Sequence, residues 1–351
     1  MAENTEISWC DHTLNLWWGC TEVHAGCDNC YAKTLATRWG FDVWGAPGSK
    51  GGVRRVIQSA WKDLDRYQRN AAKDGVIRTV FVGSMMDIFE KPMLVVNIEG
   101  DALYLESAPD PNMRADTGHL RNRFFHEISE GKYPNLLFLL LTKRPSNINK
   151  YIPESWRNFG APNNVMFGTS VVNQETADKL IPQLLEVKGK RFLSCEPLLG
   201  SVNLKEWIGT ARDRAFFHYK RTPHETSWSE ENDTATCEQG CDLDSARIDW
   251  VIVGGESGHH ARPMHPDWAQ SIQKQCAEAG VKFHFKQWGE WIAMSQAMHP
   301  VELADGEEYS ISLKFPDNGI IKIGDDAMVR SGKKAAGRLL DGKEYNALAT
   351  D

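Results

Sequence analysis

From Trp17 to Ala32 the chain reads Trp-Trp-Gly-Cys-Thr-Glu-Val-His-Ala-Gly-Cys-Asp-Asn-Cys-Tyr-Ala. The spacing of its cysteines is C-x6-C-x2-C, and the three are Cys20, Cys27 and Cys30. A β-type run from Thr13 to Trp18 precedes them, and a helical pattern from Tyr31 to Trp39 follows. Three thiolates on a loop between a strand and a helix can hold three irons of a 4Fe–4S cluster, which leaves the fourth iron without a protein ligand. A small molecule can bind at such an open iron.

Zinc is the main alternative to iron for this loop. A structural zinc site takes four ligands, and His24 or Cys10 would complete the set. Disulfides are disfavoured, because the N-terminal residues Met1–Asn4 are acidic rather than a basic secretory signal. The sequence therefore favours an iron–sulfur cluster over zinc, and either metal over paired or incidental thiols.

The composition is that of a soluble globular protein. The chain has 351 residues, of which 41% are hydrophobic and 25% charged, which allows one large α/β domain or two small ones. The net charge of −7 argues against indiscriminate coating of nucleic acid, although a local basic groove remains compatible with it. No run of about 18 apolar residues is present, so we expect no membrane span and a cytoplasmic protein.

Strand and helix patterns alternate along the chain. Six strands are expected after the cysteine loop: Val76–Val82, Leu136–Leu141, Asn164–Gly168, Lys190–Ser194, Asp249–Val253 and Val281–Phe285. Four long helices are expected between them: Gln58–Ala72, His119–Glu130, Gln174–Glu186 and Asp267–Ala279. Such alternation implies parallel strands with right-handed crossovers. No G-x-G-x-x-G follows the first strand, so we predict a full or partial (β/α) barrel of about six or seven mainly parallel strands.

Two segments interrupt this alternation. We expect the barrel to span residues 1–291, with insertions at about 99–118 and 201–247, and residues 292–351 to form a small C-terminal extension packed on it. The second insertion carries Cys237 and Cys241, which could bind zinc or a second cluster, or could be incidental thiols on a surface excursion. The extension looks β-rich, with Asp317-Asn318-Gly319 as a hairpin signal.

Polar residues follow nearly every predicted strand. In a (β/α) barrel the active site lies at the carboxyl ends of the strands, so we expect these residues to surround one cavity and bind a cofactor. They are Ser84, Asp87, Lys143, Ser170, Glu196, Gly254, Gly255, Glu256 and Lys286. Lys143 and Arg144 could hold a carboxylate or phosphate, and Glu256 an amine or ribose hydroxyl. Each residue taken alone is equally compatible with a solvated loop or a helix cap.

Several motifs together resemble one family. They are Trp-Trp-Gly-Cys-Thr-x5-Cys-x2-Cys-Tyr-Ala, Phe-Val-Gly-Ser-Met-x-Asp, Leu-Leu-Thr-Lys-Arg-Pro, Glu-Pro-Leu-Leu-Gly, Asp-Trp-Val-Ile-Val-Gly-Gly-Glu-Ser-Gly and Phe-Lys-Gln-Trp-Gly-Glu-Trp. They run from about residue 7 to residue 291, and Gly332–Arg338 extends the match. The set resembles the phage-associated three-cysteine family of uncharacterised proteins, which is itself similar to radical S-adenosylmethionine (SAM) enzymes such as spore photoproduct lyase.

This resemblance implies a partial (β/α) barrel of the radical SAM type, with a 4Fe–4S cluster held by Cys20, Cys27 and Cys30. It implies that SAM binds the open iron and is cleaved by reduction, with a nucleic-acid base or photoproduct as substrate, in the cytoplasm of a host cell. A second hypothesis is a non-catalytic iron–sulfur protein that binds nucleic acid or a host protein, with His24, Asp87 or Glu196 on the fourth iron. A zinc-stabilised binding module is the third.

Overall fold

The computed structural model describes residues 3–105, 110–210, 212–213, 215–216, 219, 224–232, 234–238, 247–297, 301–302, 308–309 and 319–351. The chain forms two compact units. The first contains Met1–Thr169, Val187–Lys190 and Thr350, and the second contains Ser170–Glu186, Arg191–Ala349 and Asp351. Within the described ranges, no helix combines the length and the apolar character that a membrane crossing needs.

Parallel strands form the core of the first unit. They are β1 (His12–Leu14), β4 (Arg78–Val82), β6 (Leu136–Thr142) and β7 (Val165–Ser170). β4 pairs with β1 on one side and with β6 on the other, and β6 pairs with β7. The apolar run of β6 is buried almost throughout, as expected for a strand of a sheet covered on both faces.

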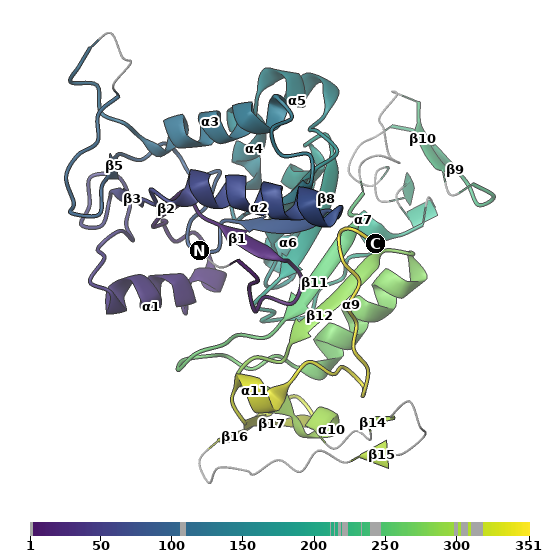
Figure 1. The fold of residues 1–351 in the computed structure, drawn as a ribbon. Helices are drawn as coiled ribbons and strands as arrows, with labels where there is room; N and C mark the ends of the chain where they lie inside the picture. Colours follow the sequence, from purple (N-terminus) through teal and green to yellow (C-terminus); the bar gives the residue numbers. More distant parts are fainter. Residues whose placement is uncertain are drawn as a thin grey trace. The chain divides into compact units, whose positions relative to one another are not determined.

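Helices connect these strands. They are α1 (Tyr31–Arg38), α2 (Ala60–Asp74), α3 (Thr117–Ser129), α4 (Ile148–Tyr151) and α5 (Glu154–Phe159). α2 packs against β1 and β6 through an apolar face that includes Leu64 and Tyr67, and it lies along β1 in Figure 1. Gly75 ends α2 in the left-handed conformation that favours glycine.

The second unit repeats the same arrangement. Its parallel strands are β8 (Lys190–Cys195), β11 (Trp250–Gly254) and β12 (Lys282–Gln287), with β11 in the middle. Its helices are α6 (Gln174–Leu185), α7 (Lys205–Ile208) and α9 (Pro266–Glu278), and α9 packs against β11 and β12 (Figure 1). Between α7 and β11, β9 (Thr226–Ser229) and β10 (Thr234–Cys237) form a hairpin within the predicted insertion.

The sheet has seven strands in the order β1-β4-β6-β7-β8-β11-β12. This order is also their order along the chain, so each new strand is added beside the previous one and the direction of winding never reverses. Such singly wound parallel strands with helical crossovers form a partial (β/α) barrel, and a doubly wound sheet is excluded. The predicted fold class is confirmed.

The first strand differs from the prediction. The run Thr13–Trp18 is not one strand, because β1 ends at Leu14 and β2 (Trp17–Trp18) belongs to a separate small sheet. That sheet also contains β3 (Arg54–Val56) and β5 (Val95–Val96). The break follows from Asn15, whose side-chain oxygen accepts a hydrogen bond from the backbone N–H of Met85 at 2.7 Å. This long-range contact turns the chain out of the main sheet.

The C-terminal region is β-rich, as expected. Its described part contains a sheet of β13 (Trp291–Ala293), β17 (Asp326–Arg330) and β16 (Ile320–Ile323), with the short helices α10 (Met294–Ala297) and α11 (Lys333–Ala336). One further antiparallel pair consists of the two-residue strands β14 (Val301–Glu302) and β15 (Glu308–Tyr309). Near its C-terminus the chain runs beside β12, and the backbone N–H of Phe285 donates to the carbonyl of Tyr345 at 2.9 Å. Cys241, Asp317 and Asn318 lie outside the described residues.

Candidate functional site

The cysteine loop begins beyond the carboxyl end of β4. The backbone N–H of Gly19 donates to the carbonyl of Met85 at 3.1 Å. Gly19 has φ +114°, and a Cβ at this position would lie 2.3 Å from the carbonyl oxygen of Val43. Only glycine fits here without strain. Cys10, by contrast, directly precedes Asp11, which donates to Thr79 at the amino end of β4 at 3.2 Å.

The middle of the loop is a short 3-10 turn. His24 caps the turn η1 (Ala25–Cys27), because its Nδ1 accepts from the backbone N–H of Gly26 at 3.0 Å. The N–H of Cys27 donates to the carbonyl of His24 at 2.8 Å, and that of Cys30 to the carbonyl of Cys27 at 3.2 Å. The Nδ1 atom of His24 is therefore already engaged in shaping the loop.

The end of the loop is tied to the residues after β4. Cys30 directly precedes α1, and the hydroxyl of Tyr31 donates to the carbonyl of Ser84 at 2.7 Å. The hydroxyl of Ser84 in turn accepts from the side chain of Asn15 at 2.8 Å. Ser84, a predicted cofactor-binding residue, thus joins both ends of the cysteine loop to the end of β4.

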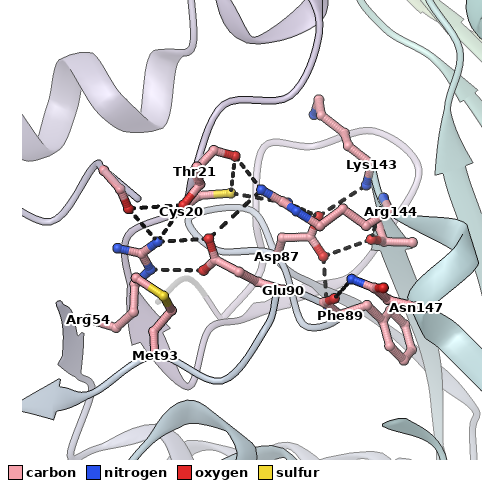
Figure 2. Close-up of polar contacts among 12 residues, drawn as sticks. Cys20, Thr21, Arg54, Asp87, Phe89, Glu90, Met93, Lys143, Arg144 and Asn147 are labelled. Atoms are coloured by element: carbon pink, nitrogen blue, oxygen red, sulfur yellow. Dashed lines mark hydrogen bonds and ion pairs between the residues drawn. The ribbon is translucent and has the colours of Figure 1, made fainter. Parts of the chain in front are cut away.

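A buried cluster of charged side chains lies beneath Cys20 and Thr21 (Figure 2). Asp87, only 4% exposed, occupies its centre. One carboxylate oxygen accepts from the hydroxyl of Thr142 at 2.7 Å. The other accepts from the backbone of Lys143 at 3.1 Å and from Nη1 of Arg144 at 2.6 Å. Asp87 therefore fixes the end of β6 to the loop after β4.

The second acid of the cluster is Glu90, which pairs with Arg54. The two side chains are 4% and 0% exposed, and two hydrogen bonds of 2.7 and 2.9 Å join them. Arg54 also donates to the carbonyl of Val43 at 2.9 Å and to the hydroxyl of Thr21 at 2.9 Å. This pair connects β3 and the segment before it to the residue that follows Cys20.

Arg144 is the part of the cluster that reaches the cysteine. Its Nη1 lies 3.7 Å from the sulfur of Cys20, and its Nη2 donates to the carbonyl of Thr21. Burial alone would lower the pKa of Arg144, but Asp87 raises it above its usual value. Burial, and then the charge of Asp87, raise the pKa of Cys20 to about 12, and Arg144 acts in the opposite direction. Without a metal, Cys20 is therefore a neutral thiol.

Lys143 differs from its neighbour. Its backbone binds Asp87, but its side chain points away from the buried carboxylates (Figure 2). Within the described part of the chain, its ammonium group forms no ion pair. Both Lys143 and Arg144 were predicted to bind a carboxylate or phosphate. The guanidinium of Arg144 instead binds groups of the protein, so Lys143 is the better candidate to bind an anionic ligand.

Two predicted residues of the second unit form an ion pair. Glu196 follows β8, Lys286 lies on β12, and Nζ of Lys286 is 3.0 Å from the carboxylate of Glu196. Their side chains are 13% and 22% exposed. A Cβ on Gly254 would lie 2.5 Å from the same carboxylate oxygen, so glycine at the end of β11 makes room for Glu196.

Glu256 is engaged by a neighbour in sequence. Its two oxygens accept from the guanidinium of Arg262 at 2.7 and 2.9 Å, and one also accepts from the backbone of Arg262. A Cβ on Gly255 would lie 1.8 Å from the carbonyl oxygen of Trp288, so packing of the chain against itself requires this glycine. Ser170 ends β7 and is 1% exposed.

The predicted ring thus falls in two units. The first unit brings together the cysteine loop, Ser84, Asp87 and Lys143, and the second brings together Glu196, Gly254 and Lys286 around the ends of β8, β11 and β12. That all of them surround one cavity remains a prediction. Sequence reasoning missed Arg54 and Glu90. The available signal was Glu90 itself, an acid that directly follows Met85–Phe89, a stretch that is apolar apart from Asp87.

The cysteine loop offers sulfur donors to a metal group. No disulfide joins any of the seven cysteines that the structure describes, so Cys20, Cys27 and Cys30 are available as metal ligands. Over the described ranges, no three His, Cys, Asp or Glu side chains gather into a group that could hold a metal ion. Cysteine sulfurs are the donors that iron–sulfur clusters use, so the residue types on the loop are compatible with such a cluster.

Comparison with known proteins gives a family without an assigned function. The family model described as "Protein of unknown function (DUF5131)" matches residues 4–349, and the chain belongs to this family. No curated protein matches the chain, and no solved structure matches it.

Proposed function

We propose that this protein binds a 4Fe–4S cluster through Cys20, Cys27 and Cys30. The observation that carries the proposal is the position of three free thiols on one loop at the carboxyl end of β4, with a fixed guanidinium beside the first of them. The carboxyl end of the strands is where (β/α) barrels carry their active sites. Three thiolates also leave one iron open to a ligand, whereas four would close the cluster.

The motifs resemble those of radical SAM enzymes. On the basis of this resemblance, we further propose that SAM is the ligand of the open iron and that a nucleic-acid base is the substrate. A reduced cluster of this kind would supply one electron to a ligand bound at its open iron. The chain's own residues would then bind and orient that ligand. Lys143 offers a positive charge for a carboxylate of that ligand.

A second candidate function is a non-catalytic iron–sulfur protein that binds nucleic acid or a host protein. The observation that favours it is Glu256, because both oxygens of this predicted amine-binding group are occupied by Arg262. Close backbone packing also explains Gly255 without any ligand. Formation of 5′-deoxyadenosine from SAM by the reduced protein separates the two candidates, since only the enzyme produces it.

Replacement of single cysteines tests the ligand assignment. Protein purified without oxygen should be brown, and Cys20→Ala, Cys27→Ala or Cys30→Ala should remove the colour. Cys237→Ala is the matched control, because it removes a thiol that lies in the β9–β10 hairpin of the second unit. Equal loss of colour in the control and in the loop variants would overturn the assignment. A colourless wild-type protein that contains zinc would support the zinc-stabilised module.

A further inference from the structure

Arg144 lies between the sulfur of Cys20 and the carboxylate of Asp87. Its Nη1 is 2.6 Å from Asp87 and 3.7 Å from the sulfur, so one edge of the guanidinium faces both groups. Its Nη2 binds the carbonyl of Thr21, the residue that follows the cysteine (Figure 2). The side chain is 12% exposed. Solvent therefore screens the charge of Arg144 only weakly where it meets the sulfur.

The orientation of this guanidinium is fixed from behind. Asp87 accepts from the hydroxyl of Thr142 at 2.7 Å and from the backbone of Phe89 at 3.0 Å, so its carboxylate cannot turn freely. A chain of contacts thus runs from Thr142 through Asp87 and Arg144 to Cys20. In many metal sites an outer carboxylate orients the histidine that binds the metal. Asp87 has the same relation to Arg144, which it orients toward the sulfur of Cys20.

Neutralisation of buried acids does not by itself explain the position of Arg144. The cluster contains two carboxylates, Asp87 and Glu90, and two guanidinium groups, Arg54 and Arg144. Arg54 meets Glu90 through two hydrogen bonds and also donates to the hydroxyl of Thr21, but it does not donate to the sulfur of Cys20. Arg144 has only a longer contact of 3.8 Å with Glu90, and instead directs its donors to Asp87 and to the Cys20–Thr21 segment.

We propose that Arg144 is a positioning residue for the cluster, which hydrogen-bonds the iron-bound sulfur of Cys20 and raises the reduction potential of the cluster. This inference rests on the proposed function. Reduction adds a negative charge to the cluster, and a nearby positive charge and a hydrogen bond to sulfur both stabilise the reduced form. Asp87 moderates the effect, because it partly neutralises the same guanidinium.

The two members of the pair should therefore act in opposite directions. Arg144→Gln removes the charge and the fork of donors, and should lower the potential by at least the 59 mV that corresponds to a tenfold change in a one-electron equilibrium. Asp87→Asn removes the counter-charge and should raise the potential. Arg144→Lys keeps the charge but loses the second donor, and should fall between the wild type and Arg144→Gln. A purely structural ion pair would give loss of stability in both variants and no opposite shifts.

The measurement is a redox titration of the anaerobic protein followed by electron paramagnetic resonance. Lys143→Gln is the matched control, since it removes one positive charge from the adjacent residue whose side chain points away from the network. Its potential without added ligand should change by less than that of Arg144→Gln. Urea unfolding of each apoprotein shows whether the variants fold. If Arg144→Gln does not fold, Arg144→Lys and Asp87→Asn decide the question.

The failures of the two proposals are distinguishable. A wild-type protein without iron refutes the proposed function, and the role of Arg144 falls with it. A wild-type cluster whose potential matches that of Arg144→Gln, or shifts of the same sign in Arg144→Gln and Asp87→Asn, refutes the role of Arg144 and leaves the proposed function standing.

Discussion

The Arg54–Glu90 pair should dominate the stability of the region around the cysteine loop. Glu90→Gln would leave the guanidinium of Arg54, which is 0% exposed, without its counter-charge. Removal of one partner from a buried pair costs about 3–5 kcal/mol. Glutamine keeps one of the two acceptors, so the lost hydrogen bond accounts for about 1.5–3 kcal/mol of this cost, and the unpaired buried charge accounts for the rest. We therefore expect a loss of about 3–4 kcal/mol in the free energy of unfolding.

Urea unfolding followed by tryptophan fluorescence measures this loss. The denaturant midpoint should fall while the slope of the transition stays constant, since the native state keeps its compactness. Glu22→Gln is the matched control, because Glu22 pairs with Lys33 at 2.6 Å but both side chains are 45% exposed. This exposed pair should contribute less than about 1 kcal/mol. A cost of Glu90→Gln as small as that of the control would refute the argument.

Three other predictions follow from single positions. Gly19→Ala should lower the free energy of unfolding by about 2–3 kcal/mol, because alanine is strained at a positive φ and its Cβ would clash with the carbonyl of Val43. The control Gly40→Ala has φ +72° but open space around it, and should lower the free energy by about 1 kcal/mol. Burial lowers the pKa of His284 to about 4, so the unfolded chain binds more protons than the native chain between about pH 4 and 6.5. Stability should thus fall as the pH drops through this range, by at most about 3 kcal/mol from this residue, and His284→Gln should flatten the pH dependence of the urea midpoint. SAM should change the electron paramagnetic resonance spectrum of the reduced wild-type protein, and Lys143→Ala should weaken that change; an unaltered spectrum at saturating SAM would favour the non-catalytic candidate.

Much of the fold is readable from the sequence, because its periodicities are strong. The wholly apolar run Leu136–Leu141 predicts a strand covered on both faces, and β6 spans Leu136–Thr142. The helical spacing of Trp61, Leu64 and Tyr67 predicts α2 to within two residues at each end. The alternation of such elements predicts parallel strands joined by crossover helices, and the missing G-x-G-x-x-G favours the barrel over a doubly wound sheet.

The features that escaped prediction depend on contacts between distant parts of the chain. Nothing near Asn15 signals the end of β1, because the contact that turns the chain is made with Met85, 70 residues later. The helices α4 and α5 are short and separated by Pro153, so neither shows a helical period.

The same limit applies to the site. The spacing of Cys20, Cys27 and Cys30 is a local pattern and can be read directly. The Arg54–Glu90 pair, however, joins residues 36 positions apart, and the contact of Arg144 with Cys20 spans 124. A sequence shows that these charges exist but not that they are buried together beneath one loop.

The metal content of the anaerobic wild-type protein tests the central claim most directly. Elemental analysis combined with a sulfide assay should give about four irons and about four sulfides per chain, with little zinc. The same analysis of Cys20→Ala should give far less iron at an unchanged yield of folded protein. A wild-type chain that holds zinc, or holds no metal, or retains its iron after removal of all three loop cysteines, would contradict the account.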